Sequence, residues 1–166
     1  PTTIASLTET QLDGLTVTQV KGLTATQVVA LSTTQVASLS TSQIKGLTAA
    51  QVKALATSQV EALTETQIAV LNTTQFRELE AADIAGLSST QLGAISTTQI
   101  KGLTSTQLRS LTVTNVAGLT ATQLGALSAA QVGNFTTTQV QALTESQIGT
   151  LSTTQVRGFE ASDIAA

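Results

Sequence analysis

The chain contains no cysteine, histidine, methionine, tryptophan or tyrosine among its 166 residues. The absence of cysteine excludes a disulfide framework, and the absence of histidine removes the commonest general base and metal ligand. The hydroxyls of its many serines and threonines therefore lack a base that would activate them as nucleophiles. No glycine-rich phosphate-binding loop is present. We expect that the protein is not an enzyme and holds no cofactor, with Ca²⁺ as the one ion to consider.

Charge is also scarce, because only 10% of the residues are charged and the formal net charge is −3. A nucleic-acid-binding domain needs a concentration of Lys and Arg that this chain lacks. No apolar run approaches the roughly 18–20 residues that span a bilayer. The composition therefore predicts neither nucleic-acid binding nor membrane insertion, although a hydrophobic content of 41% is enough for a core.

What the chain does have is an eight-residue repeat. It runs without insertion or deletion from Leu7 to Ala166 and gives 20 octads, whose positions we label a to h. Position a is Leu in 17 octads, position e is Gln in 17, and position f is always Val, Ile, Leu or Phe. Position b is Thr or Ser in 16 octads, and position d is Thr or Ser in 17 octads. Self-similarity at a short fixed period indicates a repeat architecture.

Each octad has the residues that begin a short helix. Thr or Ser at b is a strong N-cap, and Gln three residues later completes a capping box. The apolar residues at a and f occupy the two positions of a hydrophobic staple. Position h is mostly Gly, Ala or Ser, which permit a turn or a close approach, and we expect Gly there to supply a positive φ where the turn needs one. So short a helix is unstable alone, because nucleation costs more than its few bonds return.

We therefore predict an all-α solenoid of helices of about one and a half turns, one in each octad, with a narrow core of a and f side chains. One continuous helix does not fit, because its apolar stripe would drift by about 80° in each octad. A β-solenoid is the alternative, since segments such as Thr16-Val17-Thr18 suit a pleated surface. Strand alternation would, however, send the a and f side chains to opposite faces.

A longer period of 80 residues, or ten octads, overlies the short one. The irregular octad 79–86 recurs as 159–166, and Lys21 recurs as Lys101. We expect one continuous array over residues 1–166 that contains two 80-residue units, at approximately 7–86 and 87–166. The array begins within an octad, and neither end has the polar residues of a capping repeat. We therefore expect a slice of a longer chain, or end-to-end or lateral assembly of the chain with itself.

Segments such as 54–60 (Ala-Leu-Ala-Thr-Ser-Gln-Val) and 102–108 (Gly-Leu-Thr-Ser-Thr-Gln-Leu) represent the repeat along essentially the whole chain. They resemble the Leu-Thr-x-x-Gln octapeptide arrays of very large bacterial surface or secreted proteins, described as adhesin-like or haemagglutinin-like. The resemblance implies an extracellular or cell-surface location and a structural role as a fibre, stalk or adhesin segment. A charge-poor, cysteine-free chain rich in Thr, Ser and Gln agrees with a secreted protein.

The hydroxyl groups at position d are the first candidate site. They could form an array that binds ice or carbohydrate, which is the alternative function. They could equally bond to the backbone nearby, as Thr and Ser often do. The threonines of this row are Thr10, Thr18, Thr26, Thr34, Thr66, Thr74, Thr90, Thr98, Thr106, Thr114, Thr122, Thr138 and Thr154.

Two acidic pairs, Glu80 with Asp83 and Glu160 with Asp163, are weak candidates for a Ca²⁺ site, which needs several oxygen ligands. In the alternative interpretation Asp83 and Asp163 replace Gln at the third helical position, where a negative charge favours the helix dipole. Glu80 would then pair with Arg77, three residues earlier.

Two further rows have simple interpretations. The Gln residues at e complete the capping box, with an amide ladder between neighbouring octads as the alternative. Position g carries charges of mixed sign at wide spacing, which predicts a solvated face. The charged residues at g are Asp13, Lys21, Lys45, Lys53, Glu61, Arg77, Lys101, Arg109 and Arg157.

Overall fold

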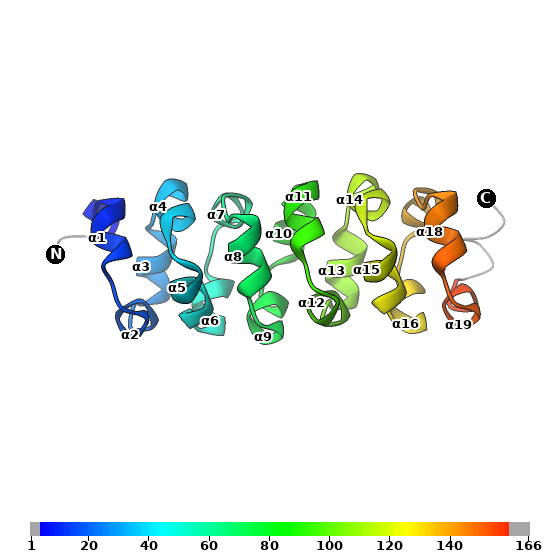
Figure 1. The fold of residues 1–166 in the computed structure, drawn as a ribbon, viewed down its shortest axis with the longest axis horizontal. Helices are drawn as coiled ribbons and strands as arrows, with labels where there is room; N and C mark the ends of the chain where they lie inside the picture. Colours follow the sequence, from blue (N-terminus) through cyan, green and yellow to red (C-terminus); the bar gives the residue numbers. More distant parts are fainter. Residues whose placement is uncertain (1–3, 160–166) are drawn as a thin grey trace.

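The computed structural model describes residues 4–159, which form an elongated rod of short helices without a strand (Figure 1). The predicted all-α solenoid with one short helix in each octad is confirmed, and the β-solenoid alternative is wrong for this range. Each α-helix has four to six residues. The elements are the 3-10 helix η1 (Ile4–Ser6) and the helices α1 (Glu9–Asp13), α2 (Val17–Lys21), α3 (Ala25–Val29), α4 (Thr33–Ser38), α5 (Thr41–Gly46), α6 (Ala49–Lys53), α7 (Thr57–Glu61), α8 (Glu65–Val70), α9 (Thr73–Arg77), α10 (Ala81–Gly86), α11 (Ser89–Ala94), α12 (Thr97–Lys101), α13 (Ser105–Ser110), α14 (Val113–Gly118), α15 (Ala121–Ala126), α16 (Ala129–Val132), α17 (Thr137–Gln141), α18 (Glu145–Thr150) and α19 (Thr153–Val156).

Helices three apart in chain order pack against each other, as α2 does with α5 and α5 with α8. Three octads therefore form one 24-residue coil, and successive coils stack along the rod. Stacking produces three columns of helices. Column A contains α1, α4, α7, α10, α13, α16 and α19, column B contains α2, α5, α8, α11, α14 and α17, and column C contains η1, α3, α6, α9, α12, α15 and α18.

The columns wind gradually about the long axis of the rod. In Figure 1, α1, α4 and α7 of column A lie along the upper edge, whereas α16 and α19 of the same column lie along the lower edge. No helix in the described range is long and apolar enough to cross a membrane.

The predicted capping box forms at the start of the described α-helices except α7 and α10, where Ala56 and Glu80 make no side-chain cap hydrogen bond. At α5 the backbone of Ser40 is extended, with φ −64° and ψ 155°, and its hydroxyl accepts a hydrogen bond from the Gln43 N–H. The Gln43 Oε1 atom in turn accepts one from the Ser40 N–H at 2.7 Å. Two donors that the helix itself cannot satisfy are thereby paired, which stabilises a helix too short to persist alone.

The expectation that glycine at position h supplies a positive φ is wrong, because no described residue has a positive φ. Gly22, for example, ends α2 with φ −79° and ψ −8°. At some h positions a small residue is needed because the neighbouring coil approaches closely. A Cβ atom on Gly102 would lie 2.6 Å from the Thr73 Cγ2 atom of the coil before, and one on Gly46 would collide with the Val17 side chain.

The a and f side chains form the continuous core that the staple pattern predicts. The f residues from Leu12 to Val132 are at most 1% exposed, because the next coil covers them. Near the end of the described chain the f residues Ile148 and Val156 are 49% and 39% exposed. Burial of each interior f residue therefore depends on the coil that follows it.

The Gln residues at e connect each coil to the one before. Gln67 is 1% exposed, and its Oε1 atom accepts a hydrogen bond from the Thr64 N–H of its own cap at 2.8 Å. Its Nε2 group donates to the backbone carbonyls of Val36 and Leu39, at 3.0 and 2.6 Å. These carbonyls lie at the end of α4, in the octads four and three before that of Gln67. The helix itself gives them few donors there, although Val36 also accepts a hydrogen bond from the Leu39 N–H.

The same pattern recurs along the rod. Gln43 donates to the carbonyls of Leu12 and Leu15, both at 2.8 Å, and Gln155 donates to those of Leu124 and Leu127, at 2.9 and 2.8 Å. We call this row of amides the glutamine ladder. Both interpretations of the e row were correct in part, since each side chain caps its own helix and also bonds to a neighbouring coil. The partners of the ladder are backbone carbonyls rather than other amides.

Replacing Gln67 by Ala should lower the free energy of unfolding by about 1–3 kcal/mol, because the buried Leu39 carbonyl loses the Gln67 donor and the Val36 carbonyl keeps only its bond from the Leu39 N–H. Gln19→Ala is the matched control, since Gln19 caps its helix but is exposed and donates to no other coil. Urea denaturation, monitored by circular dichroism, measures the free energy of unfolding of both variants and of the parent chain. Equal losses in the two variants would show that the cross-coil bonds contribute nothing.

Candidate functional site

The hydroxyl row is exposed throughout the described chain, but it is continuous in one column only. In column B every d residue carries a hydroxyl and is exposed: Thr18, Ser42, Thr66, Thr90, Thr114 and Thr138. Column C is interrupted by Ala50, and column A by Ala82 and Ala130. The thirteen predicted threonines are therefore brought together as three separate rows rather than as one surface.

Some of these hydroxyls bond within their own octad. Thr64 and Thr66 share a hydrogen bond of 3.0 Å between their hydroxyl oxygens, and so do Ser88 and Thr90 in the next coil of column B. These four residues line a groove of about 350 Å³ between α8 and α11, together with Glu65. The groove is thus rich in groups that accept and donate hydrogen bonds to a hydroxylated ligand.

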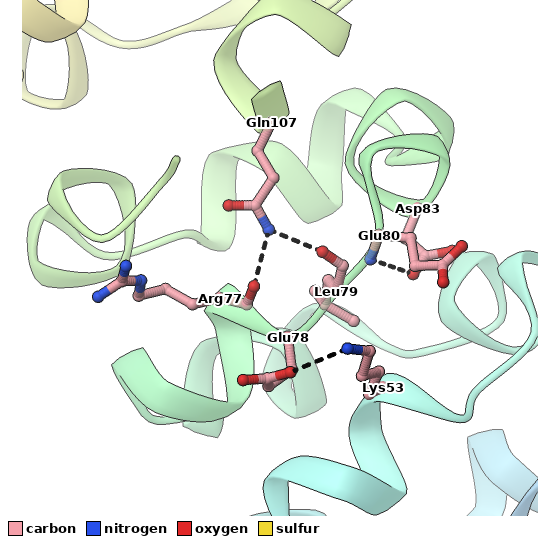
Figure 2. Close-up of polar contacts among 7 residues, drawn as sticks. All are labelled: Lys53, Arg77, Glu78, Leu79, Glu80, Asp83 and Gln107. Carbon is pink, nitrogen blue, oxygen red and sulfur yellow. Dashed lines mark hydrogen bonds and ion pairs between the residues drawn. The ribbon is translucent and has the colours of Figure 1, made fainter. Parts of the chain in front are cut away.

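Asp83 occupies an e position and is 2% exposed. Its Oδ2 atom accepts a hydrogen bond from the Glu80 N–H at 2.7 Å (Figure 2), and its Oδ1 atom accepts one from the Thr57 hydroxyl at 2.8 Å. The carboxylate therefore replaces the Gln amide in the cap, as predicted, and bonds to the coil before through Thr57.

A carboxylate has no donor for the carbonyls that the other e side chains reach. By the register of the ladder these carbonyls would be those of Val52, Lys53 and Leu55, which receive no e-row hydrogen bond in the described structure. In the following coil of column A the ladder resumes, because the Gln107 Nε2 group donates to the carbonyls of Arg77 and Leu79, at 3.3 and 2.7 Å (Figure 2). Asp83 is thus an interruption of the ladder.

The Ca²⁺ interpretation gains no support from these residues. Asp83 uses both of its oxygens within the protein, and no group of three Asp, Glu, His or Cys side chains that could hold a metal occurs among residues 4–159. Glu160 and Asp163 lie outside the described residues.

The predicted pair between Glu80 and Arg77 does not form. Figure 2 shows the Arg77 side chain extending away from Glu80, and the carboxylate of Glu78 instead lies 4.0 Å from the Lys53 ammonium group of the coil before. The Lys53 and Glu78 side chains are 64% and 38% exposed, so solvent screens this contact and it contributes little to stability.

Sequence reasoning missed an arrangement of cations. All seven Lys and Arg residues occupy position g, and Lys53, Arg77 and Lys101 follow each other at intervals of 24 residues. Because 24 residues make one coil, the three lie in successive coils of column C, on α6, α9 and α12. The interval was present in the sequence, but it has no meaning until the number of octads in a coil is known.

Replacing Asp83 by Gln should raise the free energy of unfolding by about 1 kcal/mol, since the new amide can donate to the carbonyls of Val52 and Leu55. Asp83→Ala, which removes both bonds of the carboxylate, should lower it. Thermal unfolding of the two variants beside the parent chain measures the difference. If the Asp83→Gln variant were less stable than the parent chain, position 83 would not be equivalent to the other e positions of the glutamine ladder.

Comparison with known proteins identifies the family to which this chain belongs. The model of the ALTTAQ repeat matches residues 23–57, 39–73, 76–113 and 116–153, which together make up more than half of the chain. No curated protein matches the chain as a relative. The matched segments span α3 to α18, which are stacked octads described above. On this evidence the chain belongs to the ALTTAQ repeat family.

Proposed function

We propose that the chain is a non-enzymatic structural segment of an extracellular bacterial fibre, stalk or adhesin, and that it assembles with itself end to end into filaments. The observation that carries the proposal is the uniformity of the coil-to-coil interface. The core repeats along the rod, and from Gln35 to Gln155 every amide at e donates to the position-a carbonyl 28 residues earlier, as Gln35 does to Leu7 and Gln155 to Leu127. Asp83 is the one interruption of this series among the described residues. A rod of this kind can be lengthened by adding identical coils.

The two ends of the described rod are complementary. In the first coil Gln11, Gln19 and Gln27 are exposed, and their amides donate to no other coil. In the last coils Ile148 and Val156 are exposed. Within residues 4–159 the carbonyls of Leu143 and Leu151 receive no hydrogen bond from an amide at e. Contact between the two ends of separate molecules would repeat the internal interface, which is an open head-to-tail assembly.

The extracellular and bacterial parts of the proposal rest on the resemblance to surface-protein octapeptide arrays and on the composition. A rod with a polar exterior rich in Thr and Ser and with few charges suits a spacer that holds another domain away from a cell. Antibody labelling of intact source cells tests this location, and labelling that requires permeabilised cells would contradict it.

Purified chain should form rods whose mean length rises with concentration, as measured by sedimentation and negative-stain electron microscopy. Ile148→Lys with Val156→Lys places two charges in the end face and should weaken the association at least about tenfold, because buried charges without partners are costly. Val29→Lys with Val113→Lys is the matched control, since these residues are 44% and 46% exposed on the sides of the rod.

The control variant should assemble as the parent does. A parent chain that stays monomeric over the whole concentration range, or a control that loses assembly as fully as the end-face variant, would contradict end-to-end stacking.

A second function is favoured by the uninterrupted hydroxyl row of column B, which could bind carbohydrate or ice. The columns wind about the rod (Figure 1), so the row does not lie in one plane. This geometry fits a flexible sugar polymer better than a flat crystal surface.

Thr90→Arg places a bulky side chain in the middle of the column B row and should abolish glycan binding if the row is a binding surface. Thr106→Arg is the control, because Thr106 lies between Ala82 and Ala130 in column A and has no hydroxyl neighbour at d. A glycan array and a thermal-hysteresis assay measure the two ligands. Equal signals from both variants and the parent would count against this function.

A further inference from the structure

We propose that Lys53, Arg77 and Lys101 form a binding surface for a linear acidic polysaccharide along column C. We call these three residues the column C cations. The inference does not depend on the proposed filament, because it concerns side chains on the side of the rod.

The column C cations occupy the same position on three helices that pack in sequence, α6 on α9 and α9 on α12. All three side chains are exposed. Since packed helices lie about 8–10 Å apart, the cations form a line with one positive charge at each such interval. A chain that runs along the rod can contact all three at once, and linked contacts raise the affinity above that of any single one.

Acidic residues are nearly absent from this line. Helices α6, α9 and α12 contain no Asp or Glu, and neither do their cap residues Thr48, Asn72 and Ser96. Glu78, at the end of α9, is the one acidic residue at a helix end here, and it lies 4.0 Å from the Lys53 ammonium group. In a chain with a net charge of −3, this column therefore presents a local positive line to solvent.

Hydroxyl groups accompany the cations. A groove of about 250 Å³ beside Arg77 is lined by Thr73, Thr74, Thr104 and Glu78. A guanidinium group next to hydroxyls can bind a carboxylate or sulfate while the hydroxyls bond to sugar hydroxyls.

The spacing of the cations distinguishes a polysaccharide from a nucleic acid. Duplex DNA carries one negative charge for about every 1.7 Å of its axis, far denser than one cation per coil. Single-stranded nucleic acid is bound by stacking on exposed aromatic rings. The only aromatic residues are three Phe, of which Phe76 and Phe135 are buried and Phe159 is half-buried. A polymer with one acidic group in each sugar or disaccharide has its charges at an interval comparable with that of the coils.

The long repeat explains how the line arises. Ten octads equal three coils and one additional octad, so each 80-residue unit is displaced by one column relative to the unit before. Lys21 lies in column B, and its counterpart Lys101 therefore lies in column C, where it extends the line begun by Lys53 and Arg77. The mismatch between the two periods thus assembles a surface that neither unit contains alone.

The test compares the full chain with two variants of equal charge. The column C variant removes the line by combining Lys53→Gln, Arg77→Gln and Lys101→Gln. The control variant removes three exposed g-position cations elsewhere by combining Lys21→Gln, Lys45→Gln and Arg109→Gln. Both variants change the net charge from −3 to −6. Binding to hyaluronate, to polygalacturonate, to neutral dextran and to duplex DNA is measured by calorimetry at several salt concentrations, and circular dichroism verifies the fold.

The parent chain should bind an acidic polysaccharide and not dextran, with an affinity that falls as the salt concentration rises, because salt screens exposed charges. The column C variant should lose at least about tenfold in affinity, and the control variant should lose much less. Glu78→Gln, which frees Lys53, should increase affinity. Equal losses in the two charge variants, tighter binding to duplex DNA, or no binding by the parent chain would overturn the proposal.

Discussion

The structure depends on one side-chain amide that bonds in two directions. A helix of four to six residues consists almost entirely of ends, so most of its N–H and C=O groups have no partner within it. The Gln at e satisfies an N–H of its own cap through Oε1, and carbonyls of the coil before through Nε2. Gln is the side chain suited to this task, because it carries an acceptor and two donors at the end of a flexible stem.

Stacking of the coils therefore supplies the hydrogen-bond partners and the apolar contacts that each short helix lacks. The core provides non-directional stability, since each f side chain is covered by the next coil, while the ladder fixes the register between coils. The substitutions at e show what the amide contributes. Asn115, which is shorter, still accepts from the Thr112 N–H but reaches only the Leu87 carbonyl in the coil before, and Asp83 reaches none. Stability in such an array is approximately a sum over neighbouring coils, so these positions are its weaker junctions.

Local structure could be predicted from the sequence because its causes lie within one octad. The Ser40 cap, the Gln43 capping box and the Leu39 staple are all separated by a few residues. The size of the coil could not be predicted, because the carbonyls that Gln43 reaches are 28 to 31 residues earlier and nothing in the octad specifies them. The error over glycine has the same origin, since the Val17 side chain that excludes a Cβ from Gly46 belongs to another coil.

The candidate surfaces were predictable to a similar extent. The exposure of the d hydroxyls follows from helix geometry, but the continuity of the row in column B and the line of Lys53, Arg77 and Lys101 depend on which octads become neighbours. The sequence displayed the charges at g as scattered, and the 24-residue coil groups them. Function in a solenoid of this kind is therefore a property of columns rather than of single repeats.

The number of octads in a coil is tested most directly by the distance between spin labels at positions 42 and 114, introduced as Ser42→Cys and Thr114→Cys in this cysteine-free chain. The two residues lie on α5 and α14 of column B, three coils apart, so a separation of about 24–30 Å is predicted from a helix spacing of about 8–10 Å. Coils of two octads would give about 36–45 Å at the same helix spacing, and one continuous helix would give about 108 Å. Either of these longer distances would contradict the three-octad coil.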